Sequence, residues 1–449
     1  MIKKSTLIVL LVAIAAGAAF YYFDWKRGQK EAETATTDSS KPAFSIQPDD
    51  VSSLTISYPA DPKSQPVQLE KRDGSWQITQ PIHTGAADAS VQGIVQQLAT
   101  ARVSQTEPGD PDRLKVYGLD NPDVSLDFQL KNGAKHNLKL GKKDFTGVSV
   151  YAMVDNNTKD VALLPESLLV SSDKPLQDLR DHAVLHLTSA DIDSFELKSP
   201  LSDIAATKDK DAWKFTKPFG ARADDDAITS LLSSVATAKF TVISSETADN
   251  LPKYGLTNPA ITFTASDEKG KTATLKVGKK EDDDYFAYDP ARPLIFRINQ
   301  DLYKKLTENY SDLRDKKIAH LDQPTITHVE IHNASGTIAC TRKNESEWTF
   351  DAPPDQKGKL ASPEKLFTTL DLARAEEIYD RPAAAIAARL TKPEFEAILT
   401  DKTGKTLTLQ ISKESSGSVY ARSSEAPTIY KLKTQVLTDL NFKASDLAF

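Results

Sequence analysis

Cysteine is almost absent from the sequence, since Cys340 is the only one among 449 residues. A single thiol allows no disulfide bond within the chain and no cysteine-rich metal site. Cys340 lies in the alternating run 337–341, where no neighbour in the sequence would lower its pKa toward that of a reactive thiolate. We therefore expect a buried structural thiol rather than a nucleophile.

An excess of positive charge is also lacking, because 56 lysines and arginines face 63 aspartates and glutamates, for a net charge of −7. A nucleic-acid partner would need a basic face, and a broad anionic membrane surface would need clustered lysines and arginines. The P-loop, the Gly-x-Gly-x-x-Gly fingerprint and the Gly-x-Ser-x-Gly elbow are absent as well. We expect no nucleic-acid partner, no cofactor and no catalytic residue, so the protein would not be an enzyme.

Histidines occur, but not in the pattern that a metal site requires. His328 and His332 fall on one face of an expected strand and have no third ligand in the sequence, so solvated imidazoles are expected. His182 and His186 have helical spacing, yet no glutamate follows the first histidine as it does in zinc proteases. No metal site is therefore predicted.

Runs of like charge are also expected to have structural roles. The acidic run 224–226 would cap a helix and favour its dipole. The run 281–284 would lie in a loop between strands, because its spacing is not that of a calcium-binding loop. The lysine pairs 142–143 and 279–280 each follow a glycine and are expected to be solvated turn residues at a strand-to-loop junction.

What the sequence does contain is an internal repeat. The hexapeptide Tyr-Gly-Leu-Asp-Asn-Pro at 117–122 returns as Tyr-Gly-Leu-Thr-Asn-Pro at 254–259. We expect Gly118 and Gly255 to end a short helix at positive φ, which glycine adopts without the penalty of a Cβ. The following leucine would fold back on a leucine of that helix, and Asn-Pro would launch a half-buried strand.

Other landmarks repeat in the same order. Trp76, Trp213 and Trp348 follow one another at intervals of 137 and 135 residues, and Leu-Arg-Asp at 179–181 matches Leu-Arg-Asp at 313–315. The residues expected to form this structural motif are Trp76, Tyr117, Gly118, Leu119 and Pro122 in the first copy, Trp213, Tyr254, Gly255, Leu256 and Pro259 in the second, and Trp348 in the third.

The third copy has lost the glycine of the turn. Arg389 stands in its place, directly before Leu-Thr-Lys-Pro at 390–393. A residue other than glycine at positive φ costs about 1–2 kcal/mol. We therefore expect a different turn in this copy.

Each copy is predicted to fold in the same way. A strand meander that holds the tryptophan leads into one amphipathic helix with an i, i+3, i+4, i+7 apolar stripe, and further antiparallel strands follow, which is an α+β arrangement. Asp88, Asp224 and Ser362-Pro363 are expected to open the three helices. About 135 residues can bury a core of their own. The predicted tandem domains are 44–182, 183–317 and 318–449.

The N-terminus predicts a membrane anchor. Two lysines precede an uncharged run from Leu7 to Phe23, which is long enough to span a bilayer and ends in aromatic residues suited to the interface. Ala16-Gly17-Ala18 resembles a cleavage site, so a cleaved signal peptide is the alternative. We expect an uncleaved anchor over residues 1–28 and a flexible stalk over 29–43. The bulk of the chain would lie outside the cytoplasm, on a bacterial inner membrane.

With the anchor, the repeated unit and the Tyr-Gly-Leu-x-x-Pro turn, the chain resembles the bacterial family catalogued as domain of unknown function 4340. The resemblance rests on the stretch 73–81, on Ala87-Asp88, on 117–122, on Gly141 and on Val150-Tyr151-Ala152. It covers almost the whole chain in three tandem copies, and the third departs at the turn. The resemblance implies an envelope protein, whose relatives often occur near auxiliary components of ABC-type transport systems similar to those of gliding motility.

Three functions are considered. The leading hypothesis is a non-enzymatic, membrane-anchored interaction scaffold outside the cytoplasm, an accessory of an ABC-type transport complex whose subunits would be its partners. An envelope glycan- or lipid-binding module is the alternative, and Tyr151, Tyr285, Phe286 and Tyr288 would be candidates to line its groove, although strand cores are the commoner place for such residues. A hydrolase with a cleft that gathers titratable groups from different copies is the third.

Overall fold

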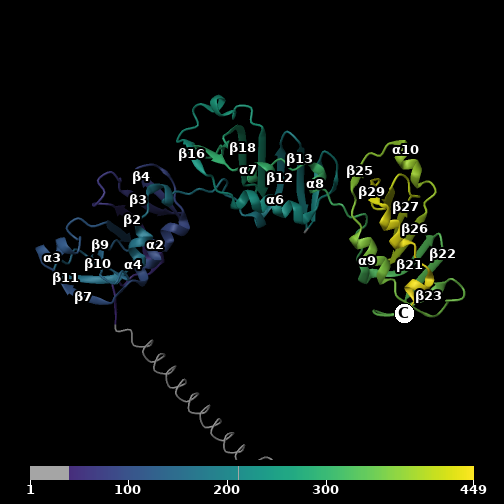
Figure 1. The fold of residues 1–449 in the computed structure, drawn as a ribbon, viewed down its shortest axis with the longest axis horizontal. Helices are drawn as coiled ribbons and strands as arrows, with labels where there is room; N and C mark the ends of the chain where they lie inside the picture. Colours follow the sequence, from purple (N-terminus) through teal and green to yellow (C-terminus); the bar gives the residue numbers. More distant parts are fainter. Residues whose placement is uncertain (1–39, 211, 449) are drawn as a thin grey trace, which may run out of the picture. The chain divides into compact units, whose positions relative to one another are not determined.

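The computed structural model describes residues 40–210 and 212–448 (Figure 1). Residues 1–39, which hold the predicted anchor and most of the predicted stalk, lie outside this part of the chain. Within the described part, no helix combines the length and the apolar character needed to cross a bilayer. The chain divides into two compact units, Met1–His182 and Ala183–Phe449.

Three antiparallel sheets of nine strands share one strand order, one sheet in the first unit and two in the second. In each, the four strands of the opening meander lie beside four strands of the closing meander, and the strand that follows the long helix takes the far edge. The orders are β5-β4-β3-β2-β8-β9-β10-β11-β7, β15-β14-β13-β12-β17-β18-β19-β20-β16 and β24-β23-β22-β21-β26-β27-β28-β29-β25. The prediction of repeated α+β domains built on antiparallel sheets is confirmed.

The first copy consists of one sheet and its helices. Its strands are β2 (Val51–Ser57), β3 (Val67–Arg72), β4 (Ser75–Gln80), β5 (Thr84–Gly85), β7 (Gln105–Pro108), β8 (Val124–Leu130), β9 (Lys135–Lys143), β10 (Ser149–Val154) and β11 (Asp160–Pro165). Its helices are α2 (Asp88–Thr100), α3 (Pro111–Val116), α4 (Glu166–Ser172) and α5 (Leu176–Leu179).

The second and third copies follow the same plan. The second has β12 (Ile192–Lys198), β13 (Asp203–Asp209), β14 (Ala212–Lys217), β15 (Ala221–Arg222), α6 (Asp225–Thr237), β16 (Val242–Ser245), β17 (Ile261–Asp267), β18 (Thr272–Glu281), β19 (Asp284–Tyr288), β20 (Ile295–Ile298), α7 (Gln300–Lys305) and α8 (Tyr310–Leu313). The third has β21 (Ile326–Asn333), β22 (Gly336–Arg342), β23 (Trp348–Ala352), β24 (Leu360–Ala361), α9 (Glu364–Leu372), β25 (Glu377–Tyr379), α10 (Ala384–Ala387), β26 (Phe395–Asp401), β27 (Thr406–Ile411), β28 (Ser418–Ser423), β29 (Ile429–Lys433) and α11 (Thr434–Leu440).

Each copy has its own apolar core, where one long helix covers one face of the sheet (Figure 1). The predicted helical stripe is buried in every copy, because its spacing places all its members on the side that faces the sheet. The buried stripe residues are Val91, Ile94, Val95 and Leu98 in α2, Ile228, Leu231, Leu232 and Val235 in α6, and Leu366 and Leu370 in α9. The third predicted member in α9, Ala373, is buried directly after the helix ends, and Phe367, which was not predicted, is also buried.

Two of the three predicted helix starts are wrong in detail. Asp224 caps α6, since its carboxylate accepts the backbone N–H of Ala227 at 3.0 Å. Asp88 is instead the first residue of α2, after the cap residue Ala87. Its carboxylate accepts the backbone N–H of Trp76 in β4. In the third copy Pro363 takes the cap position and helix α9 begins at Glu364, so Ser362 does not cap it.

The end of the predicted stalk is also structured. β1 (Lys41–Pro42) pairs with β6 (Arg102–Val103) in a two-stranded sheet, and the backbone N–H of Ala43 donates to the carbonyl of Ala101 at 2.8 Å. Residues 41–43 of the predicted stalk are therefore held by backbone hydrogen bonds, because the strand that follows α2 supplies partners for them.

Candidate functional site

The repeated turn forms the structure that its sequence predicts. Gly118 has a φ of 72° and Gly255 a φ of 71°, both in the left-handed region. The backbone N–H of Leu119 donates to the carbonyl of Leu114 at 2.8 Å, and the second copy repeats this bond at 3.0 Å. These bonds satisfy carbonyls that the end of a helix would otherwise leave open.

A second glycine, distant in sequence, explains how the turn meets the sheet. Gly141 lies in β9 against the turn, where a Cβ would come within 2.3 Å of the carbonyl oxygen of Tyr117. Gly278 in β18 has the same relation to Tyr254, at 2.2 Å. The backbone N–H of Lys142 donates to the carbonyl of Tyr117 at 2.8 Å. Only a residue without a Cβ leaves room for this approach.

The predicted strand-to-loop junction is confirmed for the first lysine pair only. Lys142 and Lys143 are the last residues of β9, directly before the hairpin loop, whereas the pair 279–280 lies inside β18, which ends at Glu281. The ladder between β9 and β10 shifts at this point, as expected for a β-bulge. The bulge lets the strand continue past the turn instead of ending at the glycine.

The turn buries a small apolar cluster on the face of the sheet opposite the main core. In β10, Val150 and Ala152 belong to the main core, whereas the intervening Tyr151 belongs to this second cluster, as strand alternation requires. We call it the turn cluster. Its members are Leu114, Tyr117, Leu119, Tyr151, Met153 and Val161 in the first copy, and Leu251, Tyr254, Leu256, Phe286, Tyr288 and Ile295 in the second.

The remaining motif residues also serve the fold. Trp76, Trp213 and Trp348 are buried in the three cores. The backbone N–H of Trp76 donates to Asp88 at 2.6 Å, and that of Trp213 donates to Asp225 at 2.7 Å, so each helix start is tied to its tryptophan strand. Pro122 is buried and Pro259 half-buried, each directly before the strand that it launches.

The third copy has replaced both glycines of the close approach. Arg389, which replaces Gly255, shows no positive φ. The buried Ser412, directly after β27, occupies the position that Gly278 has in the second copy. The hydroxyl of Ser412 accepts the backbone N–H of Tyr420 at 2.9 Å. The guanidinium of Arg389 lies 5.1 Å from the ring centre of Tyr420. The expectation of a different turn is confirmed.

Three of the aromatic residues considered for a glycan groove pack against other rings of their own copy. Tyr285 stacks on Tyr303 with ring centres 3.6 Å apart. Phe286, the next residue, packs edge-on against Tyr254 at 4.8 Å within the turn cluster. Tyr151 stacks on Tyr117 at 4.1 Å. Since neighbouring strand residues point to opposite faces, Tyr285 does not share a face with Phe286, whereas Phe286 and Tyr288 both belong to the turn cluster.

The thiol is buried in its strand, and the paired histidines of β21 contact threonines of the neighbouring strand β22. Cys340 is 1% exposed in β22, and burial, followed by the charge of Asp351, raises its pKa to about 12. His328 contacts the hydroxyl of Thr341 at 2.9 Å, and His332 contacts that of Thr337 at 3.1 Å. Among the described residues no three side chains of the metal-binding types gather at one point.

His182 and His186, whose spacing suggested a helix, lie in a segment without regular secondary structure. The acidic run 224–226 contributes the cap of α6 and the bond to Trp213. The run 281–284 closes the β18–β19 hairpin, where Arg297 pairs with Glu281 at 3.6 Å. The spacing patterns therefore have structural explanations.

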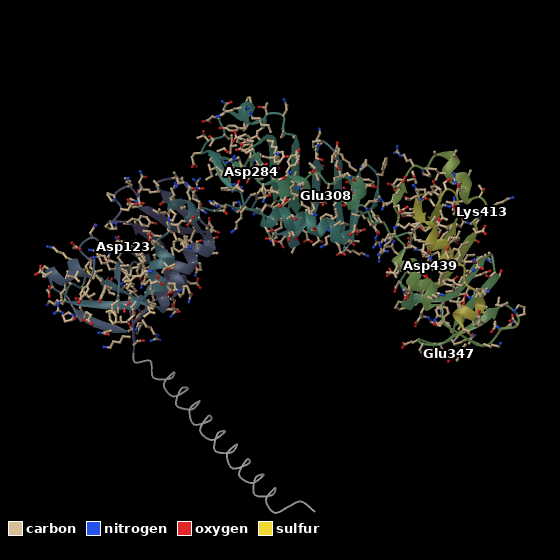
Figure 2. All side chains as sticks on the ribbon, viewed as in Figure 1. Asp123, Asp284, Glu308, Glu347, Lys413 and Asp439 are labelled. Carbon is tan, nitrogen blue, oxygen red and sulfur yellow. The ribbon has the colours of Figure 1, made fainter. Side chains whose placement is uncertain are left out.

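The hairpin that follows the bulge has a different tip in each copy. The β9–β10 tip, Asp144–Val148, exposes two apolar side chains, with Phe145 98% and Val148 70% exposed. The β18–β19 tip carries the acidic run that includes Asp284, and the β27–β28 tip, which begins at Lys413, is polar (Figure 2). The same position on one scaffold thus presents apolar, acidic or polar chemistry.

The apolar tip is preorganised by Asp144. Its carboxylate accepts the hydroxyl of Thr146 at 2.7 Å and the backbone N–H of Ser149 at 3.1 Å. The hydrogen bond from Thr146 is the main reason why the pKa of Asp144 lies below its usual range. Phe145 is therefore held out into solvent by a defined loop, at a position where burial by a partner would remove apolar surface from water.

A buried polar cluster, which we call the junction network, joins the second and third copies within the second unit. Arg314 is 4% exposed and donates to the carbonyl of Arg222 at 2.7 Å and to the carboxylate of Asp380 at 3.0 Å. Asp380 also accepts the hydroxyls of Tyr310 at 3.1 Å and Thr428 at 3.0 Å. Burial is the main cause that raises the pKa of Tyr310 to about 12, so its hydroxyl remains a donor.

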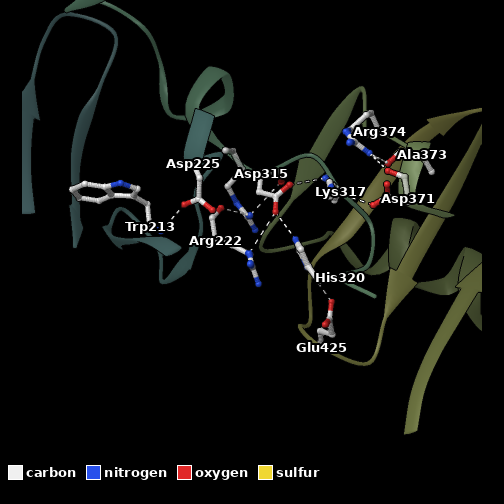
Figure 3. Close-up of polar contacts among 11 residues, drawn as sticks. Trp213, Arg222, Asp225, Asp315, Lys317, His320, Asp371, Ala373, Arg374 and Glu425 are labelled. Carbon is white, nitrogen blue, oxygen red and sulfur yellow. Dashed lines mark hydrogen bonds and ion pairs between the residues drawn. The ribbon is translucent and has the colours of Figure 1, made fainter. Parts of the chain in front are cut away.

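The other half of the junction network is centred on Asp315 (Figure 3). Its carboxylate contacts His320, accepts the backbone N–H of Lys317 at 2.8 Å and lies 3.7 Å from Arg222. Hydrogen bonds from His320 to Asp315 and to Glu425 raise the pKa of this imidazole to about 9. Burial alone would raise the pKa of Asp315, but the bonds from His320 and Lys317 outweigh it and lower the pKa.

The sequence contains one sign of this network, the Leu-Arg-Asp sequence that occurs at 179–181 and again at 313–315. Arg314 and Asp315 do not pair with one another, because Arg314 binds Asp380 and Asp315 contacts His320. Asp380, the partner of Arg314, lies 66 residues further along the chain, and His320 belongs to no recognisable sequence motif. These two residues could be found only from the packing of the two copies.

Comparisons with known proteins give one result. The model of the family described as "Domain of unknown function (DUF4340)" matches two segments, 76–212 and 213–389, which together make up more than half of the chain. The segments begin at Trp76 and Trp213, so they are out of phase with the sheets, and the second ends inside the third copy at Arg389. No curated protein and no solved structure matches the chain. The chain belongs to the DUF4340 family.

Proposed function

We propose that the protein is a non-enzymatic interaction scaffold, anchored by residues 1–28 in a bacterial inner membrane, with its sheets outside the cytoplasm. Its partners would be subunits of a membrane complex of the ABC-transporter type. The proposal rests on one comparison above all: the three copies keep the same strand order and a buried helical stripe, while their hairpin tips differ in chemistry. Variation at one position of a shared frame is what partner recognition needs.

The first tip is the strongest candidate for the contact. Phe145 and Val148 lie three positions apart in a loop that Asp144 orders through side-chain hydrogen bonds. An ordered loop loses little conformational entropy when it binds, and exposed aromatic residues are enriched at interface centres. The acidic and polar tips of the other two copies have no comparable apolar pair.

The test is affinity purification of the full chain from gently solubilised membranes, with mass spectrometry of the proteins that accompany it. The double variant Phe145→Ser/Val148→Ser is expected to lose those partners. Leu372→Ser is the matched control, because Leu372 is 69% exposed and lies in the third copy, in helix α9.

Two results would contradict the proposal. One is a wild-type protein that purifies without transporter subunits. The other is an equal loss of partners in the control and in the double variant, which would show a general effect of removing exposed apolar side chains.

A further inference from the structure

A cleft of about 570 Å³ opens beside the junction network in the second unit. The first wall comes from Pro218 to Arg222 and from Arg314 and Lys317, and the second from His320, Asp380, Arg381 and the segment from Glu425 to Thr428, with Tyr430. Five of its side chains are basic, namely Arg222, Arg314, Lys317, His320 and Arg381, and two are acidic, Asp380 and Glu425.

The basic residues fall into two groups when the copies are compared. Those that build the network recur 134 positions earlier, as Arg180, Asp181 and His186 for Arg314, Asp315 and His320. Three basic residues that line the cleft do not recur in the first copy. Gly85 stands 137 positions before Arg222, and Ala183 and Thr247 stand 134 positions before Lys317 and Arg381.

Backbone bonds confirm the register at the first of these positions. The N–H of Asp181 donates to the carbonyl of Gly85 at 2.9 Å, and that of Asp315 donates to the carbonyl of Arg222 at 3.2 Å. Glycine is therefore sufficient for the structural bond at this site. The arginine side chain in the second copy adds a charge that this backbone bond does not require.

The acidic side chains of the cleft are already engaged. Asp380 accepts hydrogen bonds from Arg314, Tyr310 and Thr428. Glu425 lies 3.4 Å from His320. Asp315, which lies behind the wall, is shared between His320 and the backbone of Lys317 and is 3.7 Å from Arg222.

Basic donors remain available at the mouth of the cleft. The side chain of Arg222 is 46% exposed. Arg381 is exposed, and its guanidinium lies 4.5 Å from the ring centre of Phe219. Deeper in, the Nε of the buried Arg314 has no hydrogen-bond partner in the part of the chain that the structure describes. A buried donor without a partner is rare, so Arg314 keeps unused hydrogen-bonding capacity beside the cleft.

We propose that this cleft binds a single anionic group, a carboxylate or a phosphate, between Arg222 and Arg381. Guanidinium groups present paired N–H donors that match both anions. Phe219, Pro218 and Pro427 form an apolar wall beside the charged mouth, against which the uncharged remainder of the ligand would lie. The inference does not depend on the protein partner proposed above.

The experiment is isothermal titration of the full chain in one detergent, at constant ionic strength, with inorganic phosphate and with glucuronate. We expect saturable binding with a Kd of about 1 mM for at least one anion. Binding of phosphate alone would identify a phosphate ligand, and binding of glucuronate alone a carboxylate ligand. Arg222→Gln and Arg381→Gln should each raise the Kd about tenfold, since each removes a charged donor.

Lys413→Gln is the matched control, because it removes one charge from an exposed residue of the third hairpin tip (Figure 2). It should leave the Kd unchanged. Chloride at the same ionic strength should not compete. The proposal is overturned if neither anion saturates, or if Lys413→Gln weakens binding as much as the arginine variants, provided that far-ultraviolet circular dichroism shows the variants folded.

Discussion

The turns of the second and third copies differ at two positions that touch one another only in the folded protein. The second copy has Gly255 in the turn and Gly278 in the strand beneath it, and the third has Arg389 and Ser412. In the second copy the turn lies so close to the strand that a Cβ on Gly278 would approach the carbonyl of Tyr254 to 2.2 Å. The third copy has neither glycine, which indicates that the two glycines act as a pair.

The third copy keeps its sheet without that close approach. Its strand order is the same as in the other two copies, and Ser412 uses its hydroxyl to hold Tyr420 instead. The fold therefore depends on the core and the ladder, while the glycine pair determines how tightly one turn packs. Four predictions test this, and all use hydrogen exchange of peptides from the copy concerned, because a chain of several domains need not unfold in one step.

The largest effect is expected for Gly278→Ala. A methyl group at 2.2 Å from a backbone carbonyl forces the turn away from β18, and overpacking of this kind costs about 3 kcal/mol of local stability. The measurement is exchange of the amides of β17 and β18. Gly93→Ala is the control, since a Cβ there meets no atom within 4 Å and should stabilise helix α2 by about 0.5–1 kcal/mol. Equal effects of the two changes would contradict the paired role.

A smaller loss is expected for Gly255→Ala. The backbone here has a φ of 71°, and an alanine in that region costs about 1–2 kcal/mol. The added Cβ would also lie 3.0 Å from the backbone nitrogen of Lys279. Faster exchange should appear in the turn and in β18 but not in α6. No change in exchange, with the turn intact, would show that glycine is dispensable at this position.

The junction network, which contacts the third copy through Asp380 and His320, is expected to make its local stability depend on pH. The folded-state pKa of His320, about 9, lies above its ordinary value of 6.5, so the stabilisation is complete below about pH 6.5 and is lost as the pH rises through 9. We expect a loss of about 1–2 kcal/mol at the junction over this range. His320→Gln should flatten the profile, whereas His332→Gln should not. A profile that rises with pH would have the wrong sign.

The smallest effect is expected for Arg389→Gly. The third turn does not use positive φ, so glycine offers no advantage there and adds freedom to the unfolded chain, a cost of up to about 1 kcal/mol. The contact with Tyr420 is lost as well, worth about 0.5–1 kcal/mol at an exposed site. Slower exchange in the third copy of this variant would contradict the account, because it would show that a glycine turn is still the more stable one there.

Features fixed by local chemistry were predictable from the sequence. The positive φ of Gly118 and the apolar stripes of the helices follow from residue type and spacing over one or two turns. The recurrence of Gly141 was visible as well. Its reason was not, because the close approach to Tyr117 brings together residues that are far apart in the chain.

The features that could not be predicted from the sequence depend on packing between elements. Asp88 looks like a helix cap in sequence, yet its carboxylate binds the backbone of Trp76 in another element. The bulge beside Lys142 depends on the register with β10. The junction network needs Arg314 and Asp380 from two different copies, and nothing in either local sequence points to the other.

The central claim is that the copies share a frame and that the first hairpin tip makes the contact with a partner. Its most direct test is a photo-crosslinking amino acid placed in living cells at Phe145, at Asp282 or at Ser416, which lie four positions after Gly141, Gly278 and Ser412 in the three copies. We predict adducts with a membrane-complex subunit from position 145 and none with that subunit from the other two. No adduct at 145, or the same adduct from all three positions, would contradict the account.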